Sequence, residues 1–317
     1  MRNRFEFNLN DPKDFVKKLI FFTKNFPYSC LLDSNSSHYN VPEKYYQYDM
    51  ICGLDSIKTL TAKDTSINKL RAFHENEKDW VFGFISYDLK NEIFNITSNN
   101  IDIYDNNNIS FFIPRHVIIL KEKTIIIESV DCKSDVTVLF EKIINFKIND
   151  DSLPKFNFSS RESKSSYLEK LKSIKDHIQR GDIYEMTFCQ EFYKENIDLP
   201  LQTLFYKLNE ITKSPFATFL KLDGFNVLGT SPERYLMKEG NYIITQPIKG
   251  TSKRSKNIKM DYDLYNKLLK SEKDISENIM IVDLVRNDLS VTAQKGSINV
   301  EDLCGVYTFS HVHQMIS

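Results

Sequence analysis

Hydrophobic and polar positions in the first 146 residues alternate in short runs that favour β-strands. Before these runs, Asp11 and Pro12 form an N-cap and first-turn pair, which predicts an amphipathic helix that ends at about residue 26. The strand-like stretches are apolar, β-branched or aromatic, and polar turns separate them. They occupy residues 29–32, 79–87, 109–113, 116–120 and 124–129. We therefore expect a sheet-rich N-terminal subdomain over residues 1–146.

The second half of the chain has a different pattern. Residues 147–164 are polar and rich in serine, which predicts a linker or a crossing between two halves. Apolar residues then keep helical spacing until Gly181, which favours the end of a helix. Residues 184–193 alternate as a strand does. We expect a second region of sheet and helix over residues 165–317.

Composition argues against several classes of function. Hydrophobic residues make up 41% of the chain, and 42 basic against 43 acidic residues leave a formal charge of −1. This balance lacks the basic excess that is typical of nucleic-acid-binding proteins. The sequence shows neither a signal-like start nor an apolar run of membrane length, so we expect a cytoplasmic protein that binds neither nucleic acid nor membrane. The five cysteines include no CxxC pair, which disfavours a disulfide framework and a zinc site.

Turn residues and ionisable groups are concentrated in residues 229–251, GTSPERYLMKEGNYIITQPIKGT. Two short strands joined near Gly240 would form a hairpin that brings Glu233 and Lys249 close together. A lysine is a nucleophile when its amine is neutral, which requires a pKa below the ordinary value of about 10.4. A carboxyl that acts as a general acid needs a raised pKa. The pattern leaves two alternatives, an acid and an amine in one cleft or a surface hairpin with solvated side chains.

A second concentration of polar groups lies in residues 273–288, KDISENIMIVDLVRND, where apolar residues fit a buried helical stripe. Asp274, Glu277 and Asn278 share another face of this helix by their spacing. Carboxylates in such positions can bind Mg²⁺, which often needs only one or two protein carboxylates beside water and substrate oxygens. A solvated helix face with local ion pairs is the alternative.

Five blocks of this sequence resemble the chorismate-utilising enzymes, a family that includes component I of anthranilate synthase, component I of aminodeoxychorismate synthase, and isochorismate and salicylate synthases. The blocks follow the order and spacing of that family. In the N-terminal half, LLDS, YQYD and GFISYDLKNEI are also similar to family segments. The five blocks are GDIYEMTFCQ (181–190), SPER (231–234), PIKGT (247–251), KDISENIMIVDLVRNDL (273–289) and GSINVEDL (296–303).

The resemblance implies an α+β fold in which two antiparallel β-sheets pack face to face with outer helices. It also implies an Mg²⁺-dependent site for chorismate. Lysine in the PIKGT block is typical of aminodeoxychorismate synthase, so the resemblance makes Lys249 a nucleophile that forms a covalent intermediate with chorismate. Glu233 becomes its general acid and base, and Glu277 becomes an Mg²⁺ ligand. The implied substrate contacts are Gly250, Thr251 and Gln190.

The same resemblance implies partners. Ammonia would come from a separate glutamine amidotransferase subunit in a heterodimer, and the product would be 4-amino-4-deoxychorismate, on the route to para-aminobenzoate and folate. Two alternatives stay open, component I of anthranilate synthase and a short non-catalytic protein that binds chorismate or tryptophan. The family also predicts a tryptophan pocket in the N-terminal sheet. Its matching positions are Ser34, Tyr45, Tyr46, Gln47, Tyr48, Pro215, Phe216 and Ala217.

Three departures from the family pattern bear on activity. Thr187 stands where the family often has Asn, and Gln314 stands where many members have the second His of a VHHLVS-like stretch. The third departure is that the family pattern continues beyond Ser317, with further metal and substrate ligands. We therefore expect a C-terminally incomplete fragment that does not turn over chorismate by itself.

Overall fold

The computed structural model describes residues 2–35, 48–100, 103–104, 106–149 and 151–317. The chain divides into two compact units. One is formed by Met1–Ile148 together with Phe205–Ser317, and the other by Asn149–Leu204. Within the described ranges, no helix combines the length and the apolar character needed to cross a membrane.

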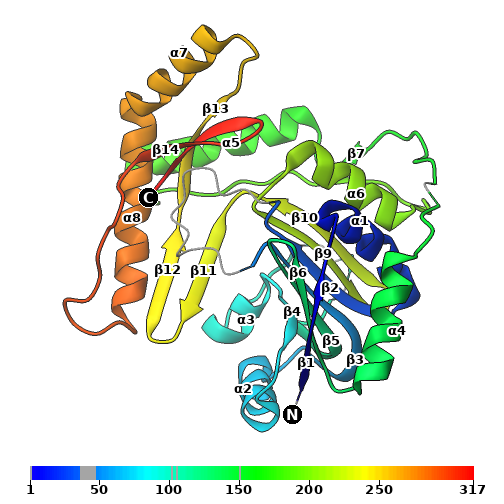
Figure 1. Cartoon of the computed structure of the whole chain (residues 1–317). Helices are drawn as coiled ribbons and strands as arrows, with labels where there is room; N and C mark the ends of the chain where they lie inside the picture. Colours follow the sequence, from blue (N-terminus) through cyan, green and yellow to red (C-terminus); the bar gives the residue numbers. More distant parts are fainter. Residues whose placement is uncertain (1, 36–47, 101–102, 105, 150) are drawn as a thin grey trace. The chain divides into compact units, whose positions relative to one another are not determined.

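An eight-stranded antiparallel sheet organises the larger unit (Figure 1). Neighbouring strands follow the order β1-β6-β5-β3-β2-β9-β10, and β4 pairs with β5 outside this path. Because β9 and β10 come from the second half of the chain, one sheet joins segments that are far apart in sequence. The strands are β1 (Asn3–Asn8), β2 (Tyr28–Asp33), β3 (Met50–Ala62), β4 (Phe82–Ile85), β5 (Ile109–Lys121), β6 (Thr124–Ser129), β9 (Phe216–Leu222) and β10 (Phe225–Ser231).

Strand β5 lies near the centre of this sheet and is buried at most of its positions. The sequence pattern predicts two strands here, but they form one strand that continues through Pro114. Proline has no backbone N–H to donate, and the register of the neighbouring strand β3 shifts between Ser56 and Lys58, next to Pro114. The irregularity in β3 thus accommodates a proline inside a long central strand.

Helices bury their apolar residues against the same sheet. In the first helix, the Asp11 side chain accepts a hydrogen bond from the backbone N–H of Asp14, as expected for an N-cap. Phe140 stacks on Phe7 with ring centroids 4.2 Å apart and lies 5.9 Å from Phe15, which joins two helices to the edge strand β1. The helices are α1 (Pro12–Phe22), η1 (Thr23–Asn25), α2 (Ser66–Glu77), α3 (Leu89–Phe94), α4 (Lys133–Ile144) and α6 (Leu201–Thr212).

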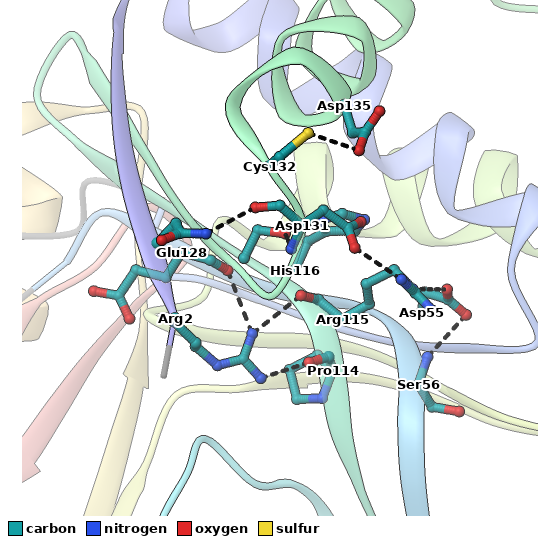
Figure 2. A network of polar contacts seen from close by, with 12 residues as sticks. Arg2, Asp55, Ser56, Pro114, Arg115, His116, Glu128, Asp131, Cys132 and Asp135 are labelled. Atoms are coloured by element: carbon teal, nitrogen blue, oxygen red, sulfur yellow. Dashed lines mark hydrogen bonds and ion pairs between the residues drawn. The ribbon is translucent and has the colours of Figure 1, made fainter.

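Arg2 fixes the edge strand β1 to the strands beside it (Figure 2). Its side chain is 9% exposed, and its Nε donates to Asp79 at 2.6 Å. Its Nη2 donates to the carbonyl of Pro114 at 2.6 Å, and its Nη1 donates to the carbonyls of Arg115 at 3.1 Å and Glu128 at 3.4 Å. One guanidinium therefore satisfies three backbone acceptors and one carboxylate.

A second set of contacts in Figure 2 surrounds His116. Its Nδ1 lies 2.9 Å from the hydroxyl of Ser129, and its Nε2 lies 3.6 Å from Asp131. Burial lowers the pKa of His116, although the Asp131 carboxylate opposes this effect. Arg115 donates to Asp131 at 2.8 Å and to Asp55 at 3.2 Å, so the network links the turn after β6 to the irregular part of β3.

The C-terminal part of the larger unit adds two smaller antiparallel sheets and two helices. A two-stranded hairpin precedes a three-stranded sheet with the order β13-β15-β14. Both helices pack against strands of this small sheet. The elements are β11 (Arg234–Glu239), β12 (Tyr242–Gln246), β13 (Ile248–Lys253), α7 (Ile258–Leu269), α8 (Glu272–Ser290), β14 (Gly305–Thr308) and β15 (Val312–Ile316).

An ion-pair cluster holds helix α7 against this sheet. Arg254 Nε donates to both carboxylate oxygens of Asp261, at 2.9 and 3.0 Å, and its Nη1 donates to the carbonyl of Phe309 at 2.5 Å. Buried His313 lies between Asp261, 3.2 Å from its Nε2, and Thr308, 2.9 Å from its Nδ1. The hydrogen bonds from Arg254 hold the pKa of Asp261 well below its usual range.

The smaller unit contains helix α5 (Lys164–Arg180) and the short strands β7 (Ser159–Ser160) and β8 (Phe192–Tyr193), which pair antiparallel. The helix begins after the N-cap Ser163 and ends at Gly181, whose φ of 81° is the left-handed conformation that glycine favours. The predicted helix is therefore confirmed. The strand predicted over residues 184–193 is wrong except at its last two residues, because only these find a partner strand.

The fold class is confirmed: the described part of the chain is a mixed fold of antiparallel sheets and helices. The domain boundaries predicted at residues 146 and 164 stay a prediction.

We predict that Arg2→Met destabilises the larger unit by about 2–3 kcal/mol, since buried acceptors lose a charged donor. The matched control is Arg4→Met, because Arg4 lies two residues further on, in strand β1, and its side chain is 57% exposed. Urea unfolding gives the free energy of unfolding of both variants. Equal unfolding midpoints for the two variants would contradict the role given to Arg2.

We predict that Asp261→Asn lowers the unfolding midpoint near neutral pH and weakens its dependence on acid pH. The folded-state pKa of Asp261 lies below the unfolded value, so its stabilising contribution is complete above the ordinary range near pH 4 and is lost as pH falls through the folded pKa. Exposed Asp263 on the same helix provides the control Asp263→Asn. Parallel stability curves for Asp261→Asn and the unmodified protein between about pH 5 and pH 2 would refute this expectation.

Candidate active site

Glu233 lies next to the segment that carries Lys249. Its Oε1 accepts a hydrogen bond of 3.2 Å from the backbone N–H of Ile248, the residue before the lysine. The turn that presents Glu233 is closed by Ser231, whose hydroxyl accepts from the Glu233 N–H at 3.2 Å. Hairpin β11–β12 follows, with its turn at Gly240, as the sequence predicts. The hairpin therefore returns the chain so that an acid and a lysine lie at its base.

The strand that carries Lys249 is irregular at that residue. Pairing between β13 and β15 shifts register between Ile248 and Thr251, so residues 249 and 250 face a single residue, Met315. Gly250 has a φ of 95°, and a Cβ added there would lie 2.9 Å from the Cβ of Asp274. Only glycine allows both this conformation and this close approach of helix α8.

Asn278 of helix α8 connects the helix to this irregularity. Its side chain is buried, with the residue 1% exposed. Its Nδ2 donates to the carbonyl of Lys249 at 3.3 Å and to that of Met315 at 3.1 Å. Its Oδ1 accepts from the hydroxyl of Ser317 at 2.5 Å, and the same hydroxyl accepts from the backbone N–H of Cys304 at 2.8 Å. One amide therefore joins segments from β13, β15 and the start of β14.

Glu277, the predicted Mg²⁺ ligand, lies on the same helix as a partly exposed side chain. Its carboxylate is 3.2 Å from the Nζ of Lys273, and its side chain is 41% exposed. The ion pair is open to solvent, so an incoming cation can replace Lys273 at this carboxylate. Among the described residues, no group of three or more His, Cys, Asp or Glu side chains is placed to hold a metal ion. With an ion pair that can be exchanged, Glu277 can serve as one protein carboxylate beside substrate oxygens and water, and its binding of Mg²⁺ stays a prediction.

Thr251 and Gln314 are directly opposite each other on β13 and β15. Gln314 is 7% exposed, and its amide oxygen has no hydrogen-bond partner among the described residues. Its neighbour His313 contacts Asp261 and Thr308, so it is not available to replace the histidine that the family pattern places at position 314. Gln190, the remaining predicted substrate contact, lies in the smaller unit, where its Nε2 donates to the carbonyl of Glu162 at 3.2 Å.

The residues predicted for a tryptophan pocket lie partly within the described structure. Tyr45, Tyr46 and Gln47 are outside the described residues. Asp33, next to Ser34, pairs with Ala217 across strands β2 and β9, which places Ser34 close to the 215–217 segment.

The polar groups around this segment bond mainly to one another. Ser34 donates through its hydroxyl to the carbonyl of Asp49 at 2.9 Å. Burial raises the pKa of the Asp33 carboxyl, which accepts from the backbone N–H of Asn35 and from the side chain of Asn209. The tryptophan site stays a prediction.

The sequence pattern groups Asp274, Glu277 and Asn278 on one helix face, and the structure gives them three different surroundings. Asp274 packs against Gly250, Glu277 is open to solvent, and Asn278 is buried between strands. The anchoring role of Asn278 has a weak sequence signal, because asparagine inside a helix is unfavourable unless its side chain has a specific partner. The partners come from strands far along the chain, so spacing alone does not identify them.

Comparison with curated proteins gives relatives in two enzyme groups. Component 1 of aminodeoxychorismate synthase from Escherichia coli is 35% identical over 161 residues, which cover 51% of this chain and 35% of that protein. Component 1 of anthranilate synthase from Bacillus pumilus is 33% identical over 182 residues, 56% of this chain and 34% of that protein. The matched part thus spans about a third of the length of these relatives.

Solved structures share the fold over most of the chain. Component I of anthranilate synthase from Streptococcus pneumoniae has a TM-score of 0.70 and 17% identity, and the match covers 84% of this chain and 67% of that one. A menaquinone-specific isochorismate synthase from Escherichia coli has a TM-score of 0.60 and 13% identity, over 100% of this chain and 69% of that one. Residues 30–317 match the family described as chorismate binding enzyme. The chain therefore belongs to the chorismate-binding enzyme family.

Proposed function

We propose that this chain is component I of an aminodeoxychorismate synthase, which converts chorismate and ammonia to 4-amino-4-deoxychorismate. The observation that carries the proposal is the fixed placement of residues 248–249. Glu233 accepts from the N–H of Ile248, and Asn278 donates to the carbonyl of Lys249. A lysine in the PIKGT block, held next to an acid, supports amine attack on the substrate. The relatives named aminodeoxychorismate synthase component 1 support the same activity.

The proposed reaction uses the Lys249 amine as a nucleophile. The nitrogen forms a bond to ring carbon C2 of chorismate, the ring electron pairs shift, and the C4 hydroxyl leaves as water. Glu233 supplies the proton that the hydroxyl needs to leave. Ammonia then adds at C4, the electron pairs shift back, and the C2–N bond breaks to release Lys249. Overall, an amino group from ammonia replaces the C4 hydroxyl, and one water molecule is released.

Mg²⁺ is the proposed cofactor, with Glu277 as its ligand on this chain. The cation would offset the negative charge of a substrate carboxylate. The proposed contribution of the chain is to hold Glu277 on the helix that also carries Asn278, so that the metal ligand and the lysine segment belong to one packed element. Gly250 and Thr251 are the proposed substrate contacts on the larger unit.

The proposed ammonia donor is a separate glutamine amidotransferase subunit. The name component 1, which the relatives carry, is consistent with a partner subunit. Anthranilate synthase relatives match this chain almost as well, so the product distinguishes the two activities. Anthranilate is fluorescent, whereas 4-amino-4-deoxychorismate is identified by mass spectrometry. Because the relatives are longer than the matched part, these assays use the full-length gene product supplied with ammonia.

We predict that Lys249→Ala abolishes the covalent adduct and lowers turnover at least about a hundredfold, because no other group replaces the amine nucleophile. Intact-protein mass spectrometry with chorismate, in the absence of ammonia, detects the adduct as chorismate minus water. Lys253→Ala, on the same strand, is the control and should keep the adduct. An unchanged adduct in Lys249→Ala would overturn the assignment of the nucleophile.

We predict that Glu277→Gln raises the Mg²⁺ concentration needed for half-maximal activity about tenfold or more, because it removes the charged ligand and keeps the side-chain shape. Mg²⁺ titration of the initial rate measures this. Glu272→Gln, at the exposed first turn of the same helix, is the control. If both variants show the Mg²⁺ dependence of the unmodified protein, Glu277 is not the metal ligand.

A further inference from the structure

The irregularity in β13 leaves a structural requirement that the sheet itself does not meet. Two residues of β13, Lys249 and Gly250, face the single residue Met315. At such a bulge the regular alternation of backbone donors and acceptors is interrupted, so carbonyls near it need other donors. The side chain of Asn278 meets this need. It donates to the carbonyl of Lys249 on the bulged strand β13 and to the carbonyl of Met315 on its partner strand β15.

The geometry of Asn278 is fixed from its other side as well. Its Oδ1 accepts from the Ser317 hydroxyl at 2.5 Å, and the Cys304 thiol lies 3.7 Å from the same oxygen. Both acceptor and donor ends of the amide are engaged, and the residue is 1% exposed. A fully bonded buried amide has one orientation, because rotating it by 180° would place its oxygen against the two carbonyl acceptors.

Helix α8 contributes a second contact that sets the distance between helix and strand. Asp274 lies one helical turn before Asn278 and rests against Gly250, where an added Cβ would be 2.9 Å away. Its backbone N–H and carboxylate also bond to the N-cap hydroxyl of Ser271, which fixes the first turn of the helix. The bulge is therefore held by a steric contact at Gly250 and by hydrogen bonds at Lys249.

We infer that Asn278 is a positioning residue, which sets the location of the Lys249 side chain by holding the carbonyl of that residue. This inference rests on the proposed function, because it assigns a role to the lysine in that chemistry. Glu233 restrains the same segment from the amide of Ile248. The lysine is thus restrained on both sides through its backbone, and helix α8 supports the strand bulge that carries it.

The test compares two substitutions in the full-length protein. Asn278→Asp keeps the acceptor oxygen and removes the Nδ2 donor, and Asn278→Ala removes both. The matched control is Asn209→Ala, since Asn209 is also a buried amide, 4% exposed, whose Nδ2 donates to Asp33 on the large sheet. All variants are assayed at a temperature at which circular dichroism shows them folded.

We expect both Asn278 variants to lower kcat by about 10- to 100-fold with a small change in KM, because misplacement of a reacting group affects the chemical step. Asn209→Ala should keep the kcat of the unmodified protein. Equal losses in kcat for Asn209→Ala and the Asn278 variants would show that Asn278 acts only through stability. An unchanged kcat in Asn278→Asp would overturn the inference.

A second measurement separates this inference from the proposed reaction. Brief acetylation with acetic anhydride, followed by peptide mass spectrometry, gives the labelling rate of Lys249 relative to Lys253. The Asn278 variants should change this ratio at least about threefold, and Asn209→Ala should not. If the unmodified protein forms neither product nor adduct, the proposed function fails, and this ratio alone decides the role of Asn278. An unchanged labelling ratio of Lys249 to Lys253 in the Asn278 variants would reject the positioning role of Asn278.

Discussion

The antiparallel pairing of β2 with β9 is the contact on which the larger unit depends. It joins residues 28–33 to residues 217–222, with Leu31 opposite Phe219 at the centre of the ladder. Both of these side chains are fully buried. Without this pairing, the first half of the chain would have an open sheet edge, and β10 would lose its connection to the core. The chain leaves β10 at Ser231 and enters the SPER segment directly, so the same pairing fixes where the candidate site begins.

At the candidate site, regular structure is interrupted where chemistry is proposed. The β13 strand has a bulge at Lys249, and Gly250 has a backbone conformation that is unfavourable for other residues. Such irregularities reorient side chains, and they require support from neighbouring elements. Here helix α8 gives that support through Asn278, and the Glu233 carboxylate accepts a hydrogen bond from the backbone N–H of Ile248. These hydrogen bonds thus join three separate sequence blocks, residues 231–234, 247–251 and 273–289, at the bulge of β13.

Charged groups in this protein have two different kinds of environment. The structural ones are bonded on several sides: Arg2 bonds to three carbonyls and a carboxylate, and Asp261 bonds to Arg254 and the N–H of Ser255. Glu277, the proposed Mg²⁺ ligand, has an exposed ion pair instead. A structural charge needs fixed partners because burial is costly, whereas a group that binds a cation or substrate must be able to exchange its partner.

The sequence by itself determined the class of fold, the blocks that identify the family and three helices: the one that begins after Asp11, the one that ends at Gly181 and the one over residues 273–288. Local signals suffice for these features: Asp11 caps one helix, Gly181 ends another, and apolar runs mark several of the strands. The short-range hairpin that brings Glu233 to the Lys249 segment was predictable for the same reason.

Only the tertiary structure decided which residues hold the site together. The partners of Asn278 are Lys249, 29 residues before it, and Met315, 37 residues after it. The strand predicted at residues 184–193 finds a partner strand only at its last two residues. Long-range hydrogen bonds depend on which strands become neighbours, and periodicity carries no information about that.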